Sequence, residues 1–70
     1  MTTEKIFILP THVQSTALAL LSLESATVKE IAEESKNSLQ KTEENIIILQ
    51  QNGYIGKKEE DGIIEYFCVI

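Results

Sequence analysis

The strongest constraint on this chain is an amphipathic helix that ends at a glycine in the second half of the sequence. Four side chains recur at the i, i+3, i+7 and i+10 spacing that places them along one side of a helix: Leu39, Thr42, Ile46 and Leu49. Gly53 follows, and glycine is the residue expected just past a helix end. The sequence therefore predicts a helix at about residues 38–52 with one buried stripe.

A β-hairpin is predicted directly after this helix. Tyr54-Ile55 and residues 63–70 are rich in β-branched and aromatic side chains, as strands are. The charged segment between them ends in Asp61-Gly62, a pair that favours a two-residue hairpin turn. The expected hairpin covers residues 54–70, and its last strand is apolar on both faces.

Two shorter helices and an extended start are predicted upstream. Thr11-His-Val-Gln14 and Thr27-Val-Lys-Glu30 both match the capping box, in which the first and fourth residues exchange hydrogen bonds at a helix start. Asn37 and Ser38 are good N-cap residues for the long helix. Before Pro10, the apolar segment around Ile6 predicts a strand or an extended arm within residues 1–10.

Length and cysteine content limit what can hold so small a fold together. Seventy residues make one domain, 1–70, and a chain of this size buries only ~60% of the surface it exposes when unfolded. Cys68 is the one cysteine and His12 the one histidine, so no intrachain disulfide or cysteine-based zinc site can form. Without clustered ligands or a paired acid and base, we expect no metal, no cofactor and no enzymatic activity. Self-association is the remaining means of stabilisation.

Charge bears on the choice of partner. Six lysines and no arginine stand against eleven acidic residues, a formal net charge of −5. Domains that bind nucleic acid through phosphates are usually basic, and an anionic membrane surface would repel this chain. No apolar run approaches the ~20 residues of a membrane span. Together with a free thiol, these features lead us to expect a cytoplasmic chain without membrane contact.

The order of these segments resembles the winged helix-turn-helix family, which includes small prokaryotic and archaeal transcriptional regulators. The resemblance covers residues 16–69, and the residues that carry it are Thr27-Val-Lys-Glu-Ile-Ala-Glu-Glu34, Ser38, Ile46, Leu49 and Gly53-Tyr-Ile55. It implies a small α+β fold with a three-helix core and a β-hairpin wing, to which residues 1–10 would add an N-terminal strand. The helix before Gly53 would be the recognition helix.

The resemblance implies a sequence-specific DNA-binding transcriptional regulator. The candidate DNA contacts are polar side chains around the first half of the recognition helix and the two wing lysines: Asn37, Ser38, Gln40, Lys41, Glu44, Lys57 and Lys58. Asparagine and glutamine can pair with adenine, and lysine can reach guanine or phosphate. Family members usually carry small polar and basic residues where this chain has Glu43-Glu44, and the wing tip holds Glu59-Glu60-Asp61. A protein-interaction module that does not bind DNA is therefore the alternative.

Surplus apolar side chains indicate a second interface. Ile47 and Ile48 lie off the buried stripe of the long helix, and Ile6 and Ile8 add more apolar surface than so small a domain needs. With Ile70 of the last strand, these residues predict a homodimer interface. The same isoleucines would serve a protein partner in the alternative function.

Overall fold

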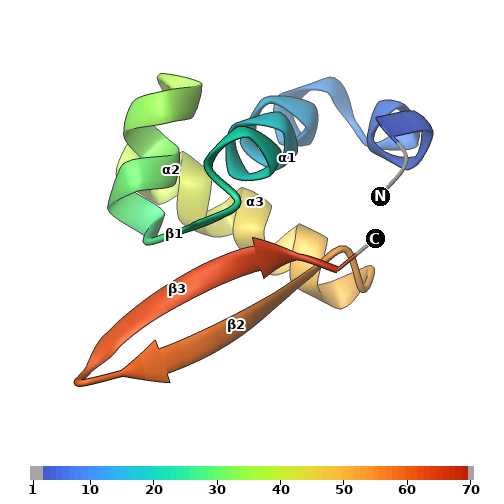
Figure 1. Ribbon diagram of the computed structural model, residues 1–70. Helices are drawn as coiled ribbons and strands as arrows, with labels where there is room; N and C mark the ends of the chain where they lie inside the picture. Colours follow the sequence, from blue (N-terminus) through green and yellow to red (C-terminus); the bar gives the residue numbers. More distant parts are fainter. Residues whose placement is uncertain (1–2, 70) are drawn as a thin grey trace.

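The computed structural model describes residues 3–69 and has the α+β arrangement of a winged helix (Figure 1). The elements follow in this order: η1 (Thr3–Ile8), α1 (Thr11–Leu23), β1 (Ser25–Ala26), α2 (Val28–Ser35), α3 (Leu39–Gln51), β2 (Ile55–Glu60) and β3 (Ile63–Cys68). The three α-helices lie over one face of the sheet, and the β2–β3 hairpin extends beyond them as the wing (Figure 1). The predicted three-helix core with a hairpin wing is confirmed.

The sheet is antiparallel, with β3 between β1 and β2. Glu60 pairs with Ile63, so Asp61 and Gly62 alone form the turn, at φ 52° and 79°. These left-handed angles suit an Asp-Gly turn, and the hairpin prediction is confirmed. The short strand β1 was not predicted, because two residues are too few to show an alternating pattern.

The caps explain where α2 and α3 begin and end. At α2, Thr27 and Glu30 form the predicted capping box. At α3, the Ser38 hydroxyl accepts a hydrogen bond from the Lys41 backbone N–H at 3.1 Å. Gly53 lies just beyond the last turn at φ 74°, a conformation that glycine adopts at no steric cost. No helix within residues 3–69 is both long and apolar enough to cross a membrane.

The core differs from the predicted stripe of α3 at one end. Thr42, Ile46 and Leu49 are buried as expected, but Leu39 is 49% exposed because it lies in the first turn, beyond the edge of the other helices. Asn45, which was not predicted to be in the core, is fully buried on the same side of the helix.

The predicted N-terminal strand is wrong, because η1 is a 3₁₀-helix. In a strand Ile6 and Ile8 would share a face, whereas the three-residue period brings Ile6 and Leu9 together against the core. The Leu9 N–H donates to the Ile6 carbonyl at 3.1 Å, which closes the turn. The Tyr54 hydroxyl donates to the Lys5 carbonyl at 2.7 Å and holds η1 in place.

Candidate interaction surface of the third helix and the wing

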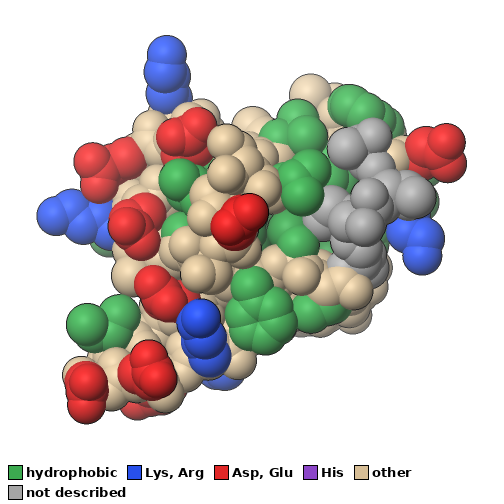
Figure 2. Space-filling model, in the orientation of Figure 1, with side chains coloured by type: hydrophobic (Ala, Val, Ile, Leu, Met, Phe, Trp, Pro, Cys, Tyr) green, Lys and Arg blue, Asp and Glu red, His purple; other side chains and the backbone are tan. Residues whose placement is uncertain are grey.

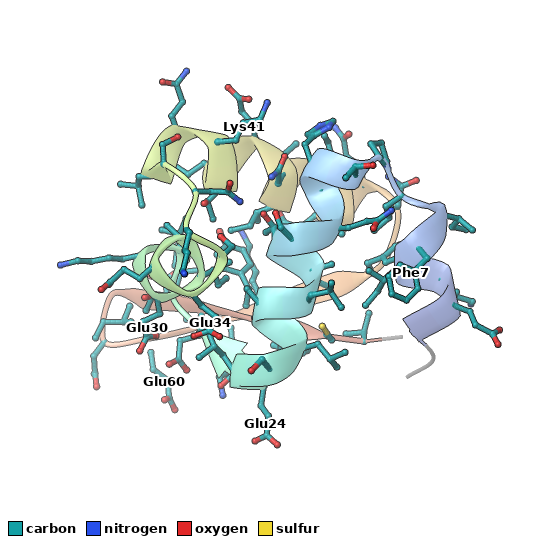
Figure 3. All side chains as sticks on the ribbon, turned by 90° about the horizontal axis from the view of Figure 1, so that it is seen from above. Phe7, Glu24, Glu30, Glu34, Lys41 and Glu60 are labelled. Atoms are coloured by element: carbon teal, nitrogen blue, oxygen red, sulfur yellow. The ribbon has the colours of Figure 1, made fainter. Side chains whose placement is uncertain are left out.

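The first half of α3 presents its polar flank to solvent. Ser38, Gln40, Lys41 and Glu44 are all exposed, and no described segment covers them. Lys41 points away from the helical core (Figure 3). These four candidate residues are therefore accessible, whereas their contact with DNA stays a prediction.

Glu44 engages both neighbouring side chains that could read a base. Its carboxylate lies 3.8 Å from the Lys41 ammonium, and it accepts a hydrogen bond from the Gln40 amide at 3.5 Å. Both contacts are exposed and weak, since surface ion pairs contribute ~0–1 kcal/mol. The ion pair matters because it neutralises the positive charge of Lys41, the one lysine of α3.

The side chain of Asn37 hydrogen-bonds within the protein and does not project into solvent like the other candidate residues. Its side-chain nitrogen donates to the hydroxyls of Ser15 and Ser35, each at 3.2 Å. These bonds tie the turn between α2 and α3 to α1. Asn37 is half-buried as a result, and its amide nitrogen is already used.

The two wing lysines lie on opposite faces of the hairpin. Neighbouring residues of a strand point to opposite sides, and Lys57 pairs with Tyr66 whereas Lys58 pairs with Glu65. Tyr66 packs against the core, so Lys57 is on the helix-facing side. On the outer side the Lys58 ammonium lies 3.7 Å from the Glu65 carboxylate.

Two of the three lysines of α3 and the wing, Lys41 and Lys58, lie within ion-pair distance of carboxylates. Carboxylates also outnumber lysines over α3 and the hairpin: Lys41, Lys57 and Lys58 stand against Glu43, Glu44, Glu59, Glu60, Asp61 and Glu65. In Figure 2 acidic side chains gather at the tip of the wing beside hydrophobic ones.

A groove of about 360 Å³ opens between α3 and the helix-facing side of the wing. We call it the α3–wing groove, and its lining is mainly apolar: Val28, Glu43, Ile46, Ile47, Gln50 and Tyr66. Ile47 is 53% exposed, and Ile64 lies on the same face of the hairpin as Tyr66, also exposed. The groove therefore offers apolar surface between the two elements that the family resemblance assigns to DNA.

Sequence reasoning identified only part of this groove. Ile47 was singled out as surplus apolar surface and Glu43 as a departure from the family pattern, whereas Gln50, three residues after Ile47 on the same side of α3, was not. Nothing in the sequence indicated that Tyr66 would face α3 across a groove, because its position depends on the pairing of β3 with β1.

The predicted homodimer interface is dispersed in the structure. Ile6 is fully buried in the core, and Ile48 is half-buried against it, so Ile6 is not available to a partner. Ile8 and Ile47 are exposed, on η1 and α3 respectively. Ile70 lies outside the described residues. The four described isoleucines thus lie on two elements and differ in exposure, and self-association through the five predicted residues stays untested.

The remaining chemistry-bearing residue is Cys68, half-buried on the helix-facing side of the hairpin. Burial raises the pKa of the Cys68 thiol, because the anionic form is poorly solvated there. Among residues 3–69, no three histidine, cysteine or acidic side chains are grouped to hold a metal ion.

No known protein family and no curated protein matches this chain.

Proposed function

We propose that this chain is a winged-helix module that binds a protein partner through α3 and the wing. One observation carries the proposal: the α3–wing groove is apolar and has a carboxylate, Glu43, in its lining. A surface that accepts a DNA backbone needs cations at this place, because neutralising phosphates supplies essentially all non-specific affinity. An exposed apolar groove with a polar rim is instead typical of protein interfaces.

DNA binding is the second candidate, and the exposed first half of α3 favours it. Ser38, Gln40 and Lys41 project from the helix that the resemblance identifies as the recognition helix. In that function Gln40 and Lys41 would read bases, and a dimer would place two such helices about one DNA turn apart. Its weakness is electrostatic, because each lysine of α3 and the wing has carboxylates nearby.

A direct test introduces a photocrosslinking amino acid in place of Ile47 in cells that express the chain. The matched control carries the same amino acid in place of Ile8, which is also exposed but lies on η1, away from the groove. We expect a discrete adduct from position 47 that protease destroys and nuclease leaves intact, and no such adduct from position 8. A nuclease-sensitive adduct at position 47, or equal labelling at both positions, would reject the proposal.

A titration with mixed-sequence duplex DNA tests the second candidate. At about 50 mM salt a non-specific DNA-binding domain should bind within tens of micromolar. We expect no change in fluorescence anisotropy over this range. Binding that weakens steeply with salt and is reduced by Lys41→Ala would instead establish DNA as the ligand.

A further inference from the structure

We infer that the partner segment in the α3–wing groove is an amphipathic helix whose apolar side chains are flanked by lysine or arginine. The inference rests on the proposed function and adds the chemistry of the partner. Three features of the groove carry it: the state of its backbone, its apolar lining and the charge around it.

The backbone that lines the groove is already hydrogen-bonded in α3 and at Tyr66, whereas residues 63–65 of β3, beyond the lining, have a partner strand on one side alone. The N–H and C=O groups of α3 are bonded within the helix, and at Tyr66 the central strand β3 is paired on both sides, with Ala26 and Lys57. An extended peptide seated against α3 and Tyr66 would therefore lose hydrogen bonds to water without gaining any, which is unfavourable for buried polar groups. A helix satisfies its own backbone and avoids this cost.

The lining suits the apolar stripe of such a helix. Val28, Ile46 and Tyr66 form apolar walls, and Ile47 stands exposed beside them. A volume of about 360 Å³ leaves room for more than one inserted side chain. Helices that bind in grooves use anchors at i, i+3 or i+4 and i+7, which a lining of this kind can receive.

The charge around the groove favours basic residues on both sides of the partner helix's apolar stripe. Glu43 lies in the lining, and Glu59 is on the helix-facing side of the wing, opposite Ile64. Lys57 is the one lysine of the hairpin on that side. The whole chain carries −5, so a basic segment is attracted, both in the complex and during approach.

A second copy of this chain is a poor occupant by the same reasoning. Its exposed apolar side chains on α3 and at the wing tip have carboxylates beside them, so like charges would meet at the rim. Phe7 and Ile8 of η1 are preceded by both Glu4 and Lys5, which gives that segment no net charge to match the groove.

The test uses three fluorescently labelled synthetic peptides and the full chain. The first has leucines at i, i+3 and i+7 with lysines at the other positions, the second replaces those lysines by glutamates, and the third scrambles the first so that no stripe remains. We expect only the first to bind, with increased helical circular dichroism and with NMR shifts confined to the groove lining. Equal binding of the glutamate or the scrambled peptide would overturn the inference.

Two substitutions in the chain locate the site. Ile47→Gln removes exposed apolar surface and should weaken binding of the first peptide about tenfold, while Glu43→Lys should weaken it severalfold. Glu33→Lys is the matched control, because it makes the same charge change at an exposed position of α2 outside the groove. If both lysine substitutions weakened binding equally, the attraction would come from the net charge of the chain, and the groove would be rejected as the binding site. Circular dichroism of each variant confirms that it folds.

The two proposals fail in different ways. If a protein adduct forms at position 47 but the first peptide fails to bind, the partner chemistry is wrong and the proposed function stands. If position 47 gives only a nuclease-sensitive adduct, both are wrong.

Discussion

Asn45 is a buried polar residue of α3 that hydrogen-bonds to α1. Its side-chain nitrogen donates to the His12 carbonyl at 2.9 Å and to the Thr16 hydroxyl at 3.0 Å. Its side-chain oxygen is buried, and no described atom hydrogen-bonds to it. The two hydrogen bonds therefore fix how α1 and α3 meet. The unpaired side-chain oxygen lowers the stability of the fold.

Replacing Asn45 tests this arrangement. We expect Asn45→Ala to destabilise the fold by about 2–3 kcal/mol, because it leaves a cavity and removes the partner of the Thr16 hydroxyl. Urea denaturation followed by circular dichroism measures the loss. Gln51→Ala, an exposed substitution on the same helix, should change stability by less than ~0.5 kcal/mol. Similar values for both variants would contradict a core role for Asn45.

The Cys68 thiol should react slowly in the folded chain. Because burial raises its pKa, the folded state holds the proton to higher pH than the unfolded state, and less reactive thiolate is present at a given pH. Alkylation by iodoacetamide at about pH 8 should be slower in buffer than in denaturing urea. Because the pKa of the thiol is higher in the folded state, the free energy of unfolding falls as pH rises past the ordinary thiol pKa. Cys68→Ala should reduce that fall. Equal alkylation rates in the two solvents would refute the shift.

At the scale of the element, two sequences that match the capping box have different outcomes. Thr27 and Glu30 form the complete box at α2. At α1 the expected box is wrong: the helix begins after Pro10, and the Gln14 amide donates to the Leu9 carbonyl at 2.8 Å. Gln14 is drawn away from Thr11 because η1 packs beside α1 and offers unpaired carbonyls. Neighbouring structure, rather than the four-residue pattern, decides which bond forms.

The end of α2 has a strained residue that can be relieved. Lys36 caps the helix in the left-handed conformation, at φ 60°, where a side chain is disfavoured. Lys36→Gly should stabilise the chain by about 1 kcal/mol, since glycine adopts this conformation without steric conflict. Lys36→Ala removes the same charge but keeps the Cβ atom, so it should give little gain. Thermal unfolding of both variants separates strain from charge.

At the scale of the whole molecule, η1 completes a core that is otherwise small. Ile6 and Leu9 enter the same apolar cluster as α1, α3 and β2. Ile8, two residues from Ile6, is 79% exposed. The first residues of the chain thus supply stability through one side of a short helix. Self-association, which we expected to stabilise so short a chain, is not needed to explain the burial of Ile6.

A pair of isoleucine substitutions tests this contribution. Ile6→Ala should lower the free energy of unfolding by about 2–4 kcal/mol, because it empties a fully buried site. Ile8→Ala makes the same chemical change on the exposed side of η1 and should alter stability by less than ~0.5 kcal/mol. Chemical denaturation of the two variants gives both values. A large effect of Ile8→Ala at high protein concentration alone would indicate that Ile8 lies in a dimer interface.

The α-helices and the hairpin were predictable because each depends on short-range spacing, whereas η1 and β1 were not. The Gly53 stop, the Thr27 cap and the Asp61-Gly62 turn act within a few residues of sequence. The candidate site was less predictable. The exposed flank of α3 followed from helical periodicity, but the groove beside it depends on where β3 lies, and no local pattern specifies that.

The sequence by itself determined the order of the three α-helices and the hairpin, the turn of the wing and the excess of acidic side chains. The tertiary structure decided which apolar residues stay exposed together. It buried Ile6 in a 3₁₀-helix, left Ile47 in solvent and placed Tyr66 across from it. The physical reason is that a side chain's burial depends on the segments that pack over it, and the spacing along the chain does not contain that information.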